Sequence, residues 1–211
     1  MIRIGDSMKE RPILFSAPMV RAILEGRKSM TRRVVKSQPL DMLIPSRIEE
    51  NLYISSMGAK YKCPYGIPGD RLWVKETWAK TRVAQAGGEE WFVYRECDNR
   101  TDYGGPWKSS RFMPRIASRI LLEITNVRVE RLQMISYGDS IAEGACRFNE
   151  IPVVTMMNEP NRWSMENPMN TDQCLSSPLW AFANYWGKIN GPGSWEANPW
   201  VWIVEFKRVK P

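Results

Sequence analysis

The chain has 211 residues, of which 43% are hydrophobic and 25% are charged, a composition typical of a globular protein long enough to bury one core. No apolar stretch approaches the roughly 20 residues of a membrane-spanning helix, and the opening MIRIGDSMKERPILF carries charges where a signal peptide would be apolar. We therefore expect a cytoplasmic protein that has no membrane partner.

Net charge and missing residue types narrow the expected functions. The net charge of +7 and the pI of about 9.3 favour an anionic partner, with nucleic acid or a nucleotide ahead of a membrane surface. There is no histidine and the four cysteines are far apart, so we expect no metal site and assign no cofactor. Ten tryptophans can stack on bases, although most of them are expected to fill the core. Protein partners are left open.

The predicted elements begin with a strand and a short helix. PILFSA, residues 12–17, is apolar enough for a strand, and PMVRAILEG, residues 18–26, has its apolar residues on one helical face. Pro18 suits the first turn of the helix, and Gly26 suits the position just past its end.

A basic turn follows the helix. EGRKSMTRRVV, residues 25–35, leads into a second predicted strand and includes Thr31 among its cations. The cations of this turn are Arg27, Lys28, Arg32 and Arg33. A cation cluster confined to a turn between two core elements predicts an anion site, with an accident of composition as the alternative.

The middle of the chain is predicted to contain a connection and two strands. Residues 37–67 include several prolines and are expected to be mostly an insertion-like loop. PGDRLWVKETW, residues 68–78, predicts a turn that leads into a strand of alternating apolar residues. EEWFVYRE, residues 89–96, predicts another strand after a loop at Gly87–Gly88.

A long strand and a short helix come next. SRILLEITNVRVERL, residues 118–132, changes the phase of its apolar alternation near Thr125–Asn126, which predicts a β-bulge that bends the sheet. SYGDSIAEG, residues 136–144, predicts a helix capped by Ser136 and ended by Gly144.

Glu143 lies at the last position of this helix. The helix dipole disfavours a carboxylate there by roughly 0.3–1 kcal/mol, which invites a functional explanation. A solvated glutamate would lose almost nothing, and the local sequence by itself favours that simpler interpretation.

The C-terminal third completes the predicted domain. Residues 146–177 are expected to be a long insertion, residues 178–186 an amphipathic helix, and residues 200–206 a strand that is apolar on both faces and therefore central. We predict one α+β domain over 1–211, a small curved sheet or mixed β-barrel with short helices at its openings. Its expected core covers 11–36, 68–145 and 178–209.

Four motifs resemble the ASCH domain of the PUA-like superfamily. GRKSMTRR resembles the GxKxxTxR signature, PGDRLWV resembles the GD-x-L-x-V strand, SYGDSIAEG resembles the helix that carries an acidic residue, and VWIVEF resembles the closing strand. The flanking sequence is similar to the long ASCH proteins of phages and prophages. The resemblance implies a PUA-like β-barrel that handles RNA or modified nucleosides.

Within this family the chain is most similar to the bacterial N4-acetylcytidine amidohydrolases. That likeness implies catalytic roles for Lys28, Thr31 and Glu143, with Glu76 in WVKET as the alternative acid. Amide hydrolysis needs a nucleophile, a base and an acid, and without histidine a lysine and a carboxylate must fill the last two roles.

The chemistry of these residues also stands on its own. Burial and neighbouring arginines would lower the pKa of Lys28, so that its neutral amine could take the proton of Thr31 while Glu143 protonates the departing amine. The residues expected to bind the substrate or nucleic acid are Arg27, Arg32, Arg33 and Trp73.

Two alternative functions do not require amide hydrolysis. The same four cations could cradle an RNA backbone in a protein that only binds, with Thr31 donating to a phosphate oxygen. A ribonuclease of phage origin is the other alternative, because a lysine, a threonine and an acid can also serve phosphodiester cleavage. A fold resemblance does not choose among these functions.

Overall fold

The computed structural model describes residues 8–47, 49, 51–82, 90–97, 106–148, 162–169 and 173–210. The predicted Gly87–Gly88 loop and half of the 146–177 insertion lie outside these residues. Of the helices that the structure describes, none has the length and apolar composition needed to cross a membrane.

Strands and short helices alternate along the described chain. The larger strands are β1 (Glu10–Leu14), β2 (Met30–Val34), β6 (Arg71–Lys75), β7 (Trp78–Arg82), β8 (Glu90–Tyr94), β9 (Leu121–Arg131) and β12 (Trp200–Val209). The shorter strands are β3 (Leu43–Pro45), β4 (Leu52–Ser55), β5 (Lys60–Lys62), β10 (Cys146–Arg147) and β11 (Trp163–Ser164). The α-helices are α1 (Ala17–Leu24), α2 (Tyr137–Ala142) and α3 (Pro178–Asn190). The 3₁₀ turns are η2 (Arg95–Cys97), η3 (Ser110–Phe112), η4 (Arg115–Ala117) and η5 (Leu132–Met134).

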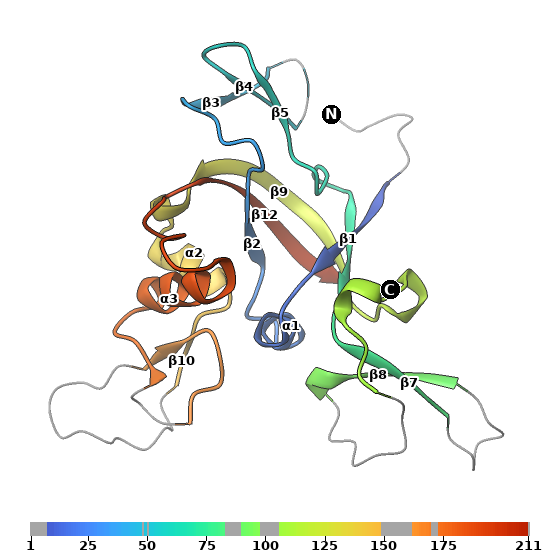
Figure 1. Ribbon diagram of the computed structural model, residues 1–211. Coiled ribbons are helices and arrows are strands. Elements are labelled where there is room, and N and C mark those ends of the chain that lie inside the picture. The colour runs from blue at the N-terminus through green and yellow to red at the C-terminus, as the bar shows by residue number, and fades with distance from the viewer. Residues whose placement is uncertain are drawn as a thin grey trace, which may run out of the picture.

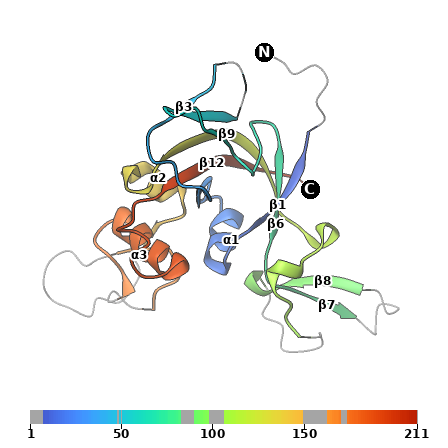
Figure 2. The same cartoon turned by 45° about the horizontal axis from the view of Figure 1, so that its top comes forward.

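A five-stranded mixed sheet organises the molecule, so the α+β class predicted from the sequence is confirmed. Its strand order is β1-β6-β9-β12-β2, with β1 and β6 parallel and the other neighbours antiparallel. The terminal strand β12 lies between β9 and β2, as its two apolar faces predicted. Helices α2 and α3 lie together on one side of the molecule, and the β7–β8 hairpin lies on the other (Figures 1 and 2).

The predicted bulge is present in β9. Glu205 pairs with Asn126 and Phe206 pairs with Ile124, so Thr125 is the extra residue that shifts the register. Such a bulge lets the chain change which face it buries and increases the bend of the sheet. The long arcs of β9 and β12 in Figure 1 show this curvature.

The curved sheet stays open, so of the two predicted forms, a curved sheet and a β-barrel, the described residues show the curved sheet. In the described residues, β1 and β2 form its two edges and do not pair with each other. A side chain spans the opening instead, because Nη2 of Arg33 on β2 donates to the carbonyl oxygen of Leu14 on β1 at 2.5 Å. The two edge strands are joined in sequence by α1, which is packed against the core through its apolar face.

Helix α1 has the boundaries that its sequence predicted. Ser16 precedes it, a proline occupies its first turn, and Gly26 adopts a φ of 75°, in the left-handed region that favours glycine. Its residues Met19, Val20 and Ile23 are buried in the main core. The tight exit after Gly26 is what brings Lys28 back towards the body of the protein.

Residues 37–67 contain more structure than expected. Strands β3, β4 and β5 form an antiparallel three-stranded sheet in the segment that was predicted as mostly loop. The strands are only three or four residues long, so their alternation is too short to stand out among the prolines. The hydroxyl of Tyr53 donates to the carbonyl oxygen of Val127, which ties this small sheet to β9.

Candidate active site

A cavity of about 440 Å³ lies where the main sheet is open. Its walls include the end of β1, β2 and α3, of which α3 lies far from the two strands in sequence. The polar residues that line it are Ser16, Lys28, Thr31, Arg32, Arg33, Tyr65, Ser110, Glu143, Tyr185 and Asn190. The volume falls within the range of roughly 300–1,000 Å³ that is typical of small-molecule sites.

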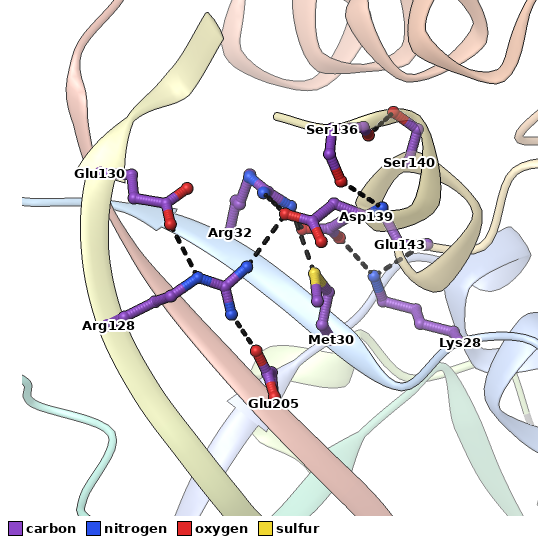
Figure 3. Close-up of polar contacts among 10 residues, drawn as sticks. All are labelled: Lys28, Met30, Arg32, Arg128, Glu130, Ser136, Asp139, Ser140, Glu143 and Glu205. Carbon is purple, nitrogen blue, oxygen red and sulfur yellow. Dashed lines mark hydrogen bonds and ion pairs between the residues drawn. The ribbon is translucent and has the colours of Figure 1, made fainter. Parts of the chain in front are cut away.

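Lys28 is buried in the cavity wall and paired with Glu143. Its Nζ donates to Oε2 of Glu143 at 2.7 Å and to the main-chain oxygen of the same residue at 2.8 Å. Only 1% of the Lys28 side chain and 3% of the Glu143 side chain are exposed. Figure 3 shows the lysine reaching the end of α2, where Glu143 follows the last helical residue.

The environment of Lys28 lowers its pKa below that of an ordinary lysine. Burial is the largest cause, because it disfavours the ammonium ion, and the pair with Glu143 opposes it. Arg33 and Arg32 add a further lowering through charge repulsion. The predicted direction is therefore confirmed, with burial rather than the arginines as the main reason.

Thr31 lines the same cavity as Lys28 and Glu143. It lies on β2 opposite Val204 of β12 and is 4% exposed. The hydrogen bonds of the Lys28 amine go to Glu143 and not to the threonine hydroxyl. The three residues expected to be catalytic thus meet at one cavity, with the lysine and glutamate in direct contact.

The interpretation of Glu143 as a solvated residue is wrong. Gly144, with a φ of 111°, ends α2 so closely against α1 that an added Cβ would lie 3.1 Å from Cβ of Ala22. This close approach buries Glu143 between two cations, Lys28 and Arg32. Their charges offset the unfavourable position of a carboxylate at the C-terminal end of a helix.

Arg32 extends the pair into a buried network. Its Nη1 donates to Oε1 of Glu143 at 3.2 Å, and its Nη2 donates to Oδ2 of Asp139 at 2.6 Å. Arg128 donates to the same oxygen of Asp139 and also pairs with Glu130 and Glu205 (Figure 3). Burial opposes ionisation of Asp139, but the hydrogen bond and charge of Arg32 hold the pKa of this carboxyl below its usual value.

Arg33 differs from the other cations of the turn. Its side chain lines the cavity, with Cζ 5.1 Å from the ring centroid of Phe15. Arg27, in contrast, lies outside the cavity lining, where it pairs with Glu25 and donates to the carbonyl oxygen of Gly144 at 2.8 Å. The structure therefore separates Arg27 from the predicted binding residues.

Glu76 and Trp73 also lie away from this cavity. Glu76 is 2% exposed and accepts two hydrogen bonds from Arg119, at 2.9 and 2.8 Å, and it is not part of the cavity lining. Trp73 lies on β6 with the Lys75 amine 5.5 Å from its ring centroid. The geometry thus favours Glu143 over Glu76 and gives no support to Trp73 as a ligand contact in the cavity.

Aromatic side chains complete the cavity, and the sequence alone did not identify them as ligand contacts. They are Phe15, Tyr65, Phe182, Tyr185 and Trp186. Phe182 and Trp186 are buried on the apolar face of the amphipathic helix that the sequence predicted, but helical periodicity does not show that a cavity lies beside that face. Tyr65 is in the segment predicted as loop, so no signal marked it.

Two other features of the described residues bear on ligand binding. A more open hollow of about 880 Å³ lies between α3 and residues 192–196, and its Lys188 is paired with Glu166. No group of three or more His, Cys, Asp and Glu side chains is arranged to hold a metal ion in the part of the chain that the structure describes. The 440 Å³ cavity, which holds the buried lysine pair, is therefore the candidate active site.

Ser136 supports the site indirectly by capping α2. Its Oγ accepts a hydrogen bond from the amide of Asp139 at 3.0 Å, as the sequence predicted. We expect Ser136→Ala to lower the free energy of unfolding by about 1 kcal/mol, because this amide would lose its partner at the exposed helix start. Urea denaturation of the variant and of Ser136→Asp, which keeps an acceptor, would measure the effect. Equal stability of Ser136→Ala and the parent would contradict it.

Comparison of the chain with protein-family models, with curated proteins and with solved structures found no match.

Proposed function

We propose that this protein is a PUA-like ASCH domain that hydrolyses the N4-acyl amide of an acylated cytidine in the 440 Å³ cavity. One observation carries the proposal: a buried lysine with a lowered pKa is paired with a glutamate in the wall of a cavity that Thr31 also lines. A perturbed pair of ionisable groups in a concave site is typical of acid–base chemistry. The motif resemblance to amidohydrolases supplies the substrate class.

The proposed reaction assigns each proton to a group. Starting from neutral Lys28 and protonated Glu143, the lysine takes the proton of Thr31 as its oxygen attacks the acyl carbon. The C–N4 bond breaks as Glu143 gives its proton to N4, which releases cytidine and leaves the acyl group on Thr31. Water then gives a proton to Glu143 and attacks this ester, and Lys28 returns its proton to the oxygen of Thr31 as the carboxylic acid leaves. Both groups are then back in their starting states.

The contact between Lys28 and Glu143 suits the neutral pair from which the reaction starts. The 2.7 Å hydrogen bond between Nζ of Lys28 and Oε2 of Glu143 allows the pair to exchange one proton without the movement of either side chain. Arg32 fixes the other carboxylate oxygen of Glu143 at 3.2 Å. Preorganised groups of this kind reduce the reorganisation that the reaction requires.

The cavity lining also suits a flat heteroaromatic ligand. Five aromatic side chains supply apolar and stacking surface, and the hydroxyls of Ser16, Tyr65 and Tyr185 are spread among them. Nucleoside sites combine such surfaces with a few polar groups that fix orientation. A binding site for a splayed-out base of RNA would use the same features.

Non-catalytic RNA binding is the alternative, and the net charge of +7 together with the cavity-facing Arg33 favours it. The cradle of four cations that it requires is incomplete, however. Arg27, Lys28 and Arg32 already pair with carboxylates, so phosphate contacts would have to displace these ion pairs. The same objection applies to a ribonuclease, which must also hold a phosphate beside Thr31.

The test of the proposal is an assay of the parent protein. Incubation with N4-acetylcytidine is expected to release cytidine and acetate. Chromatography and nuclear magnetic resonance would detect these products. N4-methylcytidine, which has no acyl carbon, is the matched control and is expected to remain intact. Absence of cytidine release, together with salt-sensitive binding of single-stranded RNA, would replace this proposal with the binding alternative.

A further inference from the structure

Arg33 is a cation of the cavity that the proposed reaction does not use. It is partly buried and lines the cavity from β2. Its Nη2 donates to the carbonyl oxygen of Leu14, whereas its Nε is buried without a hydrogen-bond partner. In the part of the chain that the structure describes, no carboxylate pairs with this guanidinium group, so donors remain available on it.

The other cations of the cavity have their charges matched. Glu143 accepts from both Lys28 and Arg32, and Asp139 provides Arg32 with a second carboxylate. Arg128 also pairs with Asp139, and it has two further carboxylate partners, Glu130 and Glu205. The excess positive charge of the cavity therefore lies at Arg33.

Even partial burial of a guanidinium group without a carboxylate is costly unless another group supplies acceptors. The carbonyl of Leu14 supplies one, and the ring of Phe15 offers its face at 5.1 Å. Tyr65 also lines the cavity, and burial raises the pKa of its hydroxyl while the charge of Arg33 opposes this rise. A neutral hydroxyl and a guanidinium group without a carboxylate, both lining one cavity, are a pair of donors that suits an oxyanion.

We infer that the ligand of this cavity carries an oxyanion, a phosphate or a carboxylate, that pairs with Arg33 and Tyr65. The nucleoside part of the ligand rests on the proposed function. Lys28 Nζ and Arg33 Cζ lie 5.6 and 5.1 Å from the same Phe15 ring centroid, so one small molecule can reach both groups. The preferred substrate is then an acylated cytidine 5′-monophosphate, or a cytidine whose acyl group ends in a carboxylate.

The first arm of the test requires no catalysis. Isothermal titration calorimetry on the parent protein compares cytidine with cytidine 5′-monophosphate at low salt. If the phosphate pairs with Arg33, the monophosphate should bind roughly tenfold to hundredfold more tightly. The second arm compares N4-acetylcytidine with N4-succinylcytidine on the Thr31→Ala variant, which is expected not to turn either over, and detects an oxyanion on the acyl group.

Variants assign the preference to Arg33. Arg33→Gln should remove the preference for the anionic ligand, and Arg33→Lys should keep part of it because a point charge remains. Arg47→Gln removes the same charge from an exposed position outside the cavity lining and should keep the whole preference. Thermal denaturation of each variant shows whether it is folded.

The outcomes separate this inference from the proposed hydrolysis. A preference in either arm that disappears in Arg33→Gln supports the oxyanion site, even if the parent protein hydrolyses nothing. Equal affinities for the neutral and anionic ligands in both arms, with Arg33 present, overturn it, even if N4-acetylcytidine is hydrolysed. A preference that Arg33→Gln retains, or that Arg47→Gln loses, also overturns it.

Discussion

Lys28→Arg is expected to abolish the release of cytidine from N4-acetylcytidine while the variant still binds the nucleoside within a few fold of the parent. Arginine keeps the positive charge and can still pair with Glu143, but it does not lose its proton at neutral pH and so cannot serve as a base. The role of the lysine belongs to the transition state, so the loss should fall on kcat rather than on binding. We expect a loss of roughly 10²-fold or more.

The pH dependence of the same reaction provides a second measurement. The reaction starts from neutral Lys28 and protonated Glu143, a pair that holds one transferable proton, so kcat should fall with rising pH once the pair has lost that proton. Because burial lowers the pKa of Lys28, this fall should begin below the pH of 10.5 at which an ordinary lysine is half neutral. A rate that rises only above that pH would contradict the assignment.

Thr31 supplies the matched comparison for the lysine variants. Thr31→Ala should lose cytidine release as completely as Lys28→Arg, because one removes the nucleophile and the other its base. Thr31→Ser keeps a hydroxyl and should retain measurable activity. If Lys28→Arg and the parent hydrolyse the substrate equally, Lys28 is an anion contact and not the base. If neither protein hydrolyses the substrate, the amidohydrolase proposal gives way to binding alone.

Glu143→Leu is expected to produce the largest loss of stability among the site variants, about 3–5 kcal/mol in the free energy of unfolding. Glu143 is 3% exposed and accepts from Lys28 and Arg32, whose side chains are 1% and 0% exposed. Removal of the carboxylate leaves Lys28 buried without an ionic partner, while Arg32 keeps Asp139. Denaturation in urea, monitored by tryptophan fluorescence, gives the difference in unfolding free energy.

A double variant shows whether the lost charge pair is the cause. Lys28→Met combined with Glu143→Leu removes both buried charges of the pair and replaces them with apolar side chains of similar length. It should recover a large part of the stability that Glu143→Leu loses, since an apolar replacement of a buried pair is often neutral. If the double variant is less stable than Glu143→Leu by the full cost of Lys28→Met, the two residues do not act as a pair.

Local patterns were sufficient for the elements that carry the site. Pro18 and Gly26 marked the ends of α1, the phase change at Thr125 marked the bulge in β9, and the two apolar faces of 200–206 placed β12 inside the sheet. Each of these features depends on residues that are near one another in sequence, such as a helix cap, a strand alternation or a left-handed glycine. A sequence displays such information directly.

The sequence also selected Lys28, Thr31 and Glu143, through the residue types of a turn and of a short helix and through their resemblance to an enzyme family. It could not show that Glu143 is buried, because that depends on the approach of Gly144 to α1, a contact between segments more than a hundred residues apart. Long-range packing also places Arg27 outside the cavity lining and pairs Glu76 with Arg119.

The open sheet and its cavity were decided only by the tertiary structure. Whether edge strands β1 and β2 meet depends on the curvature of the whole sheet, on α1 between them and on α3 beside them, and no local pattern sums these contributions. The sequence determined which residues are able to do chemistry and where α1, α2, β9 and β12 lie. Packing decided which of those charges are matched, and so left Arg33 as the cation that faces the cavity without a carboxylate among the described residues.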